Sequence, residues 1–385
     1  MARPLRCANP VTKHSKHHST SSIRGRRGAV RIGFIALADC APLLVADALG
    51  LFAKHDVQVE LHREVGWATI REKILYRQID AAHAVTGLGL SLRLGLGGAA
   101  CRTIAPFIFN LHGNAITLSM DLWRRGVRDA ASLGKLIRSN PQRLITLGIV
   151  ARTSTHNFMM RRWLQSGGIN PDRDVRLVVL PPTQMVGSLA AGLIDGYCVG
   201  EPWNSAAVTR GIGWCPVTSE DLMPGHPEKV LLTTEDYAEE HPAEIRAVIR
   251  ALYEACQFCD RMDNRARVVE ILLSSGHVRA DRDVLKLSLI GPFDDGTSRR
   301  RAAENFHIFH RGDANAPSRA KAEWLLGEFI AHGLIPAEAR EQAREEVLRC
   351  CTPELFHDAL SSPAPASASK PTKSKAQAAL QPALA

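Results

Sequence analysis

The hydrophobic and polar positions in the first third of the chain alternate between two kinds of pattern. Short apolar runs rich in branched residues are typical of buried strands, and longer segments with an apolar residue every three or four positions are typical of helices. Repeated strand–helix units predict a mainly parallel sheet covered by helices, which is an α/β fold. The predicted strands are 30–35, 57–61, 81–85 and 103–109, and the predicted helices are 41–54, 67–77 and 87–96.

The same alternation restarts after residue 114 and gives way to helical patterns near residue 235. Two strand–helix arrays followed by helices predict two lobes rather than one extended sheet. The second array contains the predicted helices 127–139, 155–165 and 183–193 and strands 144–150, 175–180 and 196–199, and the later helices are 243–259, 266–273, 318–331 and 336–350.

The lobes are expected to be discontinuous in sequence. We predict that residues 30–114 together with 235–355 form the first lobe and that 115–234 form the second. The hinge would then lie where the chain crosses between lobes, near 114–119 and near 230–234.

Charge is concentrated at the N-terminal end of the chain. The formal net charge is +9, and residues 1–29 carry seven lysine and arginine residues and no acid. Such a segment is typical of a disordered basic tail. The Ser-, Pro-, Ala- and Lys-rich composition of 356–385 predicts a disordered tail at the C-terminal end as well. A contact between the basic tail and an acidic protein or a nucleic acid is the alternative, but no direct nucleic-acid binding is expected.

Hydropathy and cysteine usage indicate a cytoplasmic protein. A secretory signal needs a continuous apolar run near its start, and none occurs before residue 29. No run approaches the length of a membrane span. The nine cysteines show no even framework, and Cys256 and Cys259 are interpreted as buried helix thiols rather than a metal or redox pair. A start codon further upstream would favour a periplasmic or membrane-associated location instead.

The turns that follow strands are the candidate binding positions, because ligands of open α/β sheets bind beyond the carboxyl ends of the strands. Several such turns open a predicted helix or lie at a lobe crossing, and helix N-termini favour anions. These turns are 66–69, 113–115, 153–157 and 200–204, with 226–229 close to the second crossing.

The side chains in these turns suit a monovalent oxyanion. Trp67 and Asn114 offer neutral N–H donors, His156 offers a ring N–H, and Lys229 offers a full positive charge. No pocket of carboxylates for a metal is evident, so neither a metal nor a cofactor is expected. Each residue also has an ordinary structural interpretation, as a core aromatic, a turn former, an exposed helix residue or a solvated charge. The prediction of an anion site rests on their shared position in turns at the ends of strands.

At these positions the sequence resembles the nitrate- and bicarbonate-binding receptors of ABC transporters, the NrtA/CmpA family. The resemblance extends over about residues 30–335 and implies a type II periplasmic-binding-protein fold, with two lobes, a hinge and a ligand cleft between the lobes. The segments that carry it are 33–42, 67–73, 113–119, 155–157, 198–204 and 226–229.

The same resemblance implies which residues bind the ligand. The family's anion-binding positions correspond to Trp67, Asn114, His156 and Lys229 of this chain. At the position of Asn114 the nitrate receptor has glutamine. The bicarbonate branch places an acid near the position of Lys229 and uses calcium, so a lysine favours nitrate or nitrite without a metal. The candidate ligand-binding set is Trp67, Ala68, Asn114, Gly113, His156, Glu201 and Lys229.

Exported members of the family carry a lipoprotein signal, which is not visible here, and the chain therefore resembles the cytoplasmic nitrate/nitrite sensor branch (NasS-like). This implies a sensor that is not an enzyme and whose partners are a small anion and an RNA-binding antiterminator of the ANTAR class. The first alternative is the solute-binding component of a nitrate ABC transporter. The second is an enzyme on the same fold, with Cys40 as nucleophile and His156 as its base.

Overall fold

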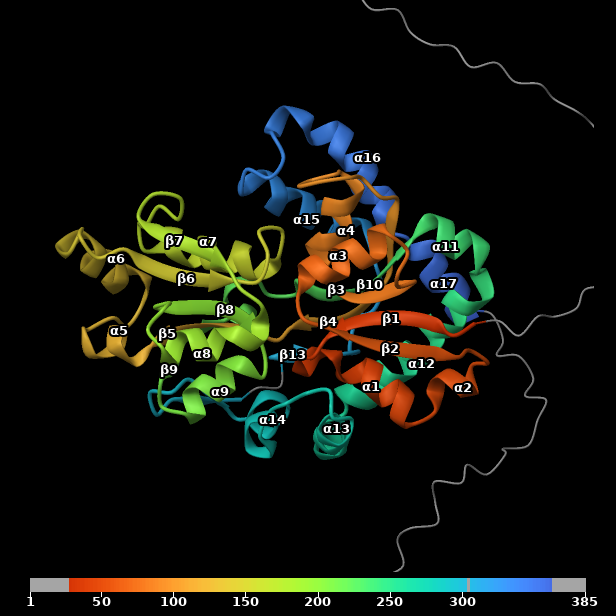
Figure 1. Ribbon diagram of the computed structural model, residues 1–385, viewed down its shortest axis with the longest axis horizontal. Coiled ribbons are helices and arrows are strands. Elements are labelled where there is room, and N and C mark those ends of the chain that lie inside the picture. The colour runs from red at the N-terminus through yellow and green to blue at the C-terminus, as the bar shows by residue number, and fades with distance from the viewer. Residues whose placement is uncertain (1–27, 303–304, 362–385) are drawn as a thin grey trace, which may run out of the picture.

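The computed structural model describes residues 28–302 and 305–361, which form two α/β lobes side by side (Figure 1). The first lobe is built on a six-stranded sheet with the strand order β13-β4-β10-β3-β1-β2. These strands are β1 (Val30–Ile35), β2 (Val59–Glu64), β3 (Ala81–Val85), β4 (Thr103–His112), β10 (Pro227–Thr234) and β13 (His307–Ile308).

The second lobe is built on a five-stranded sheet with the order β7-β6-β8-β5-β9. Its strands are β5 (Asn114–Ser119), β6 (Ile145–Ile149), β7 (Val175–Val179), β8 (Gly196–Gly200) and β9 (Gly213–Thr218). A separate two-stranded hairpin pairs β11 (Phe293–Asp294) with β12 (Arg300–Arg301).

Helices cover both faces of each sheet. Around the second sheet they are α5 (Met120–Arg124), α6 (Ala130–Ser139), α7 (Thr155–Ser166), η2 (Pro182–Gln184), α8 (Met185–Ala190), α9 (Trp203–Thr209) and α10 (Ser219–Leu222). Elsewhere they are η1 (Ala38–Cys40), α1 (Ala41–Ala48), α2 (Leu51–Lys54), α3 (Trp67–Leu75), α4 (Thr86–Arg93), α11 (Glu235–Glu240), α12 (Pro242–Asp260), α13 (Met262–Ser274), α14 (Arg282–Leu289), α15 (Arg319–Ala331), η3 (Ala337–Ala339), α16 (Arg340–Cys350) and α17 (Pro353–Ser361).

The longest helix shows how sequence pattern becomes packing. In α12, Pro242 occupies the first turn, where its missing N–H has no helical partner to lose. Ile245, Val248, Ile249 and Leu252 follow at helical spacing and are all buried. They pack with α1 in the core beneath the first sheet, on the side of Figure 1 where α1 and α12 lie together.

Two of the hydrophobic clusters in the interior contain residues from both lobes. One joins Leu90 of α4 and Phe329 of α15 to Ile116 and Phe158 of the second lobe. Another joins residues of β1 and β3 to Met185 and Tyr197 of the second lobe. The two lobes are therefore packed against each other. None of the described helices is long and apolar enough to cross a membrane.

The predicted two-lobed α/β architecture is confirmed, but the sheets are mixed rather than mainly parallel. β1 pairs in parallel with β2 and β3, whereas β10 is antiparallel to both β3 and β4. In the second sheet β5 is antiparallel to β8 and β9. The chain enters the second lobe through β5 and returns to the first through β10. Neither strand follows its neighbour in the sheet by way of a helical crossover, which is the connection that makes neighbouring strands parallel.

The crossings lie a few residues before the predicted ones. The first is at His112 and Gly113, which have positive φ values of 62° and 95°, and β5 already begins at Asn114. The second lies between α10 and β10, so the segment 230–234 is inside a strand of the first sheet. Residues 227–234 therefore belong to the first lobe and not, as predicted, to the second, because a short strand that is buried along its whole length fits either sheet.

The predicted tails fall largely outside the described residues, which begin at residue 28 and end at 361. Residues 356–361 are an exception. They belong to α17, whose Phe356 and Ala359 are buried against the first lobe. The C-terminal tail was thus predicted to begin several residues too early.

Candidate functional site

A buried cluster of charged side chains lies where the two lobes meet, and Lys229 is at its centre. Lys229 is the third residue of β10 and is fully buried. Its ammonium Nζ lies 2.7 Å from Oδ2 of Asp39 and 2.6 Å from Oε1 of Glu228. Asp39 comes from η1, immediately after β1, so strand ends of the first sheet supply all three groups.

Glu228 connects the lobes. Its carboxylate accepts hydrogen bonds from Lys229, from the hydroxyl of Thr155 and from Nε2 of His226, the last at 3.2 Å. Nε2 of His156 lies 3.6 Å from the same carboxylate. Thr155 and His156 open α7 in the second lobe, so one acid of the first lobe contacts both of them.

Two aromatic side chains complete the wall around the ammonium. Nζ of Lys229 lies 5.6 Å from the ring centroid of Trp67, within range of a cation–π interaction. On the other side, Nε2 of His83 in β3 lies 3.4 Å from Oδ1 of Asp39. Both rings are buried.

Local hydrogen bonds hold the turns that carry these residues. The Thr86 hydroxyl lies 3.0 Å from the carbonyl oxygens of both Pro227 and Glu228, which fixes the start of β10 against α4. The side chain of Ser154 caps α7 by accepting from the amide of Asn157, and this leaves the neighbouring Thr155 hydroxyl free to reach Glu228.

The backbone also joins the lobes at the site. The Ala38 amide donates to the Glu201 carbonyl oxygen at 2.7 Å, which brings the turn after β8 against η1. A Cβ placed on Gly200 would lie 3.3 Å from Oδ1 of Asn114 and 3.4 Å from Oδ2 of Asp39. Asn114 and Asp39 therefore flank the same stretch of backbone.

Most of the predicted site residues come together, and two do not contribute as expected. Trp67, Gly113, Asn114, His156 and Lys229 are buried at the lobe junction. Ala68 is exposed in the first turn of α3, so its side chain cannot line a buried site. The Glu201 carboxylate is buried but accepts from the Ser205 amide and the Ser288 hydroxyl, away from Lys229.

Asp39, Glu228, His83 and Thr155 are parts of the cluster that sequence reasoning did not assign to it. A signal was present for the two acids: each interrupts an apolar strand or strand end, and a charged residue in such a place is buried only when it is paired.

The pKa values of the two acids in the cluster are shifted in opposite directions. Burial raises the pKa of the Asp39 carboxyl, although Lys229 acts in the opposite direction. Burial would also raise the pKa of Glu228, but Lys229 and His156 hold it well below its usual range. Burial would lower the pKa of Lys229, and the two carboxylates more than compensate and raise it.

His156 and His83 are neutral at physiological pH. Burial lowers the pKa of His156 to about 4, even though Glu228 nearby favours the charged form. Burial and Lys229 also lower the pKa of His83 well below its usual range. Each ring can therefore offer one N–H and one lone pair.

Several buried polar atoms of the cluster have no hydrogen-bond partner among the described residues. They are the indole Nε1 of Trp67, the amide of Asn114, both ring nitrogens of His156 and of His83, and both carboxylate oxygens of Asp39. Buried polar atoms without partners are costly, and their concentration at one place is typical of a site for a small polar ligand. No group of three or more potential metal ligands is arranged to hold an ion in the part of the chain that the structure describes.

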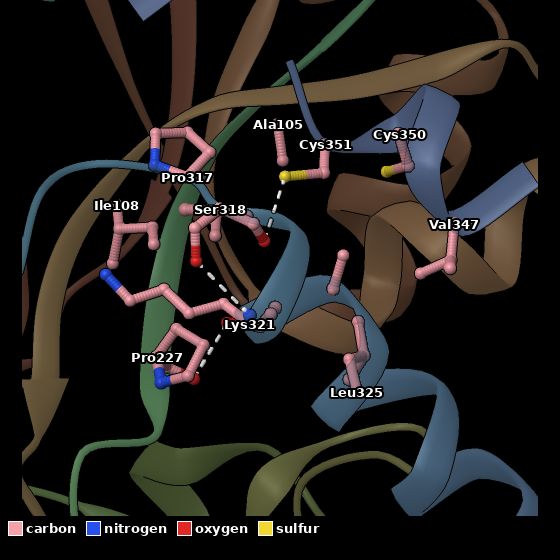
Figure 2. Close-up of a pocket in the computed structure, with 13 residues that line it drawn as sticks. Ala105, Ile108, Pro227, Pro317, Ser318, Lys321, Leu325, Val347, Cys350 and Cys351 are labelled. Carbon is pink, nitrogen blue, oxygen red and sulfur yellow. Dashed lines mark hydrogen bonds between the residues drawn. The ribbon is translucent and has the colours of Figure 1, made fainter. Parts of the chain in front are cut away.

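A pocket beside the start of β10 differs chemically from the cluster around Lys229 (Figure 2). Its walls come from β4, α15 and α16 and are mainly apolar, with Leu325 and Val347 among them. Lys321 lines it, but its Nζ is engaged by the carbonyl oxygens of Asp313 and Ala316. This pocket offers little to an anion, so we place the candidate site at Lys229.

Two α/β lobes packed around a buried polar cluster define a ligand-binding protein of the periplasmic-binding-protein type. The chain belongs to the NMT1-like family, whose profile matches residues 26–273. The predicted resemblance to nitrate-binding receptors is confirmed by the relatives described next.

The nitrate import ATP-binding protein NrtC of Synechocystis sp. is 38% identical over 331 residues, which are 85% of this chain and 49% of that protein. The chain thus spans about half the length of that relative. The nitrate/nitrite binding protein NrtA of Nostoc sp. is 30% identical over 331 residues, or 81% of this chain and 72% of that protein. The crystal structure of the periplasmic nitrate-binding protein NrtA from Synechocystis superposes with a TM-score of 0.81 at 26% identity, covering 86% of this chain and 88% of that chain.

The curated relatives described above are binding and transport proteins, and the site gives the enzymatic alternative no support. Burial raises the pKa of the Cys40 thiol well above its usual range, with Asp39 acting in the same direction. A nucleophilic cysteine needs the opposite, a thiolate stabilised by neighbouring positive charge.

The lowered pKa of His156 predicts acid sensitivity. The folded protein resists protonation of this ring, so stability that is present above pH 6.5 is lost as the pH falls toward 4. The loss from this residue amounts to about 2 kcal/mol at pH 5. We expect His156→Gln to lose about that much less stability than the wild type between pH 7 and pH 5, measured by denaturant unfolding. His62→Gln, at a partly exposed ring, is the control, and equal losses in all three proteins would contradict this prediction.

Proposed function

We propose that this chain is a receptor for nitrate or nitrite. The observation that carries the proposal is the fully buried Lys229 surrounded by N–H groups without partners, on Trp67, Asn114 and His156, at the junction of the lobes. A planar monovalent oxyanion accepts hydrogen bonds in several directions and matches this set of donors. The similarity to proteins named as nitrate- or nitrite-binding supports the same ligand.

Ligand binding should stabilise the folded protein by mass action. At a hundredfold excess of ligand over its dissociation constant the gain is about 2.7 kcal/mol. We expect nitrate or nitrite at millimolar concentration to raise the melting temperature without added divalent metal, and calorimetry to give one site per chain. Chloride and bicarbonate are the comparison anions.

A matched pair of variants separates site binding from a general salt effect. Asn114→Ala removes a buried amide of the cluster and should weaken binding, whereas Asn140→Ala at an exposed helix end should not. If neither nitrogen oxyanion shifts the melting temperature of the wild type, the receptor proposal is wrong.

We further propose that the receptor works inside the cell as a sensor that holds an ANTAR-type RNA-binding regulator and releases it when the anion binds. This partner is the one that the predicted membership of the sensor branch implies. The site supports it physically, because an anion bound between two lobes favours their closed arrangement, and a partner that prefers the open arrangement is then expelled. The coupling must be reciprocal, so the partner must also weaken anion binding by the same factor.

The alternative is the solute-binding component of a nitrate ABC transporter, which the relatives named for nitrate import support. Fractionation of cells that express the tagged full-length protein distinguishes the two. The sensor is expected in the cytoplasm and in a complex with the regulator that nitrate dissociates. Recovery from the periplasm, or a complex that nitrate does not change, would establish the transporter alternative.

A further inference from the structure

The charges in direct contact with the Lys229 ammonium do not balance. Within the described part of the cluster Lys229 is the only permanent cation, and both Asp39 and Glu228 face its ammonium within 2.7 Å. His83 and His156 are neutral. An anion that approached Lys229 would therefore be the third negative charge around one positive charge. In a volume closed to solvent, such an excess is costly.

The two carboxylates are held in very different ways. Glu228 accepts hydrogen bonds from Lys229, Thr155 and His226. Asp39 is paired with Lys229 through Oδ2 alone, and its Oδ1 has no hydrogen-bond partner among the described residues. Hydrogen bonds from several donors stabilise a carboxylate as an anion, and their absence favours the neutral acid. Asp39 is thus the acid that can lose its charge at the lower cost.

We propose that the anion binds together with one proton, which the Asp39 carboxyl takes up from solvent as the anion replaces it beside Lys229. A neutral Asp39 no longer competes for the ammonium and becomes an O–H donor that can hydrogen bond to the anion. The net charge of the cluster is then the same before and after binding. The inference rests on the proposed function, because it concerns the same anion and the same site.

Among the titratable groups that face one another here, Asp39 is the one suited to accept a proton. Lys229 and Glu228 face it from β10, His83 from β3 and His156 from α7. Burial raises the pKa of Asp39 already without an anion, whereas Lys229 and His156 hold the pKa of Glu228 low. The turn after β8 faces η1 through the main-chain oxygen of Glu201, and the adjacent Cys40 thiol stays protonated.

Calorimetry tests the proposal directly. Nitrate is titrated into the wild-type protein at one pH in buffers with different ionisation enthalpies, and the slope of the observed heat gives the protons taken up. We expect about one proton per nitrate at a pH between the pKa of Asp39 in the free protein and its higher pKa in the complex, and over that range a dissociation constant that rises up to about tenfold per pH unit. The sign follows from a pKa that binding raises, so binding is strongest at low pH.

Two aspartate variants assign the proton. Asp39→Asn carries no titratable group and should bind nitrate with little proton uptake and little dependence on pH. Asp47→Asn, at an exposed position of α1, should keep the wild-type behaviour. Undiminished uptake in a folded Asp39→Asn protein would overturn the assignment.

The wild-type measurement also separates this inference from the proposed function. Nitrate binding without proton uptake would overturn the inference and leave the receptor proposal standing. A protein that binds neither nitrate nor nitrite would overturn the receptor proposal itself. Because the proton count needs only the wild type, the inference can still be overturned if Asp39→Asn fails to fold.

Discussion

Replacing Lys229 by methionine is expected to lower the free energy of unfolding by about 3–5 kcal/mol, in addition to abolishing anion binding. The ammonium lies within 2.7 Å of both Asp39 and Glu228, and all three side chains are fully buried. Removing it would leave two carboxylates facing each other without a countercharge. Denaturant unfolding at pH 7 measures the change.

Two controls accompany this prediction. Lys54→Met removes an ion pair with Glu254 at a largely exposed lysine, where the expected loss is about 0–1 kcal/mol. Adding Asp39→Asn and Glu228→Gln to Lys229→Met should recover most of the lost stability, because the buried charges are removed together. A loss below about 1 kcal/mol for Lys229→Met alone would show that the carboxylates are not ionised beside Lys229.

Gly87→Ala is expected to force the lobes apart. Gly87 lies in α4 of the first lobe, and a Cβ at this position would overlap the carbonyl oxygen of Thr153, which precedes α7 in the second lobe. The contact involves backbone, so a side-chain rotation cannot relieve it. Overpacking of this kind typically costs about 1–3 kcal/mol, and here the lobes can escape it by separating.

The expected readouts for Gly87→Ala are a larger radius of gyration in solution scattering and at least tenfold weaker nitrate binding, with helical content retained. Gly187→Ala is the matched control. Gly187 lies in α8 with open space around its Cβ position, so alanine should be neutral or stabilising by up to about 1 kcal/mol. Wild-type dimensions and affinity in Gly87→Ala would mean that this contact does not limit closure.

The hydrophobic pattern of each short segment predicted its secondary structure well, because that pattern depends only on which side chains of the segment are buried. The mainly apolar run of β1 and the apolar stripe of α12 determine their own secondary structure wherever they pack. Strand direction and lobe membership depend instead on which sheet a strand joins. The strand β10 is buried along its whole length and would fit either sheet, so its pattern does not indicate the one to which it belongs.

The candidate site was predictable in part for a similar reason. Trp67, His156 and Lys229 stand in turns that open a helix or begin a strand, which is a property of the sequence. The pairing of Lys229 with Asp39 joins residues that are 190 positions apart, and only the parallel neighbours β1 and β3 beside β10 bring them together. Sequence therefore predicted the donors of the site and missed its acids.

The helices α15 and α16 belong to the first lobe by sequence, yet they contact both lobes. Phe329 of α15 packs on Phe158 with the ring centroids 5.8 Å apart, and Glu328 pairs with Arg162 at 2.5 Å. In the other direction α16 packs on α4 and β4. Any opening rotation must therefore either shear this helical pair or carry α15 along with the second lobe. Opening of the lobes is thus restrained by the side chains of α15 as well as by the two backbone crossings.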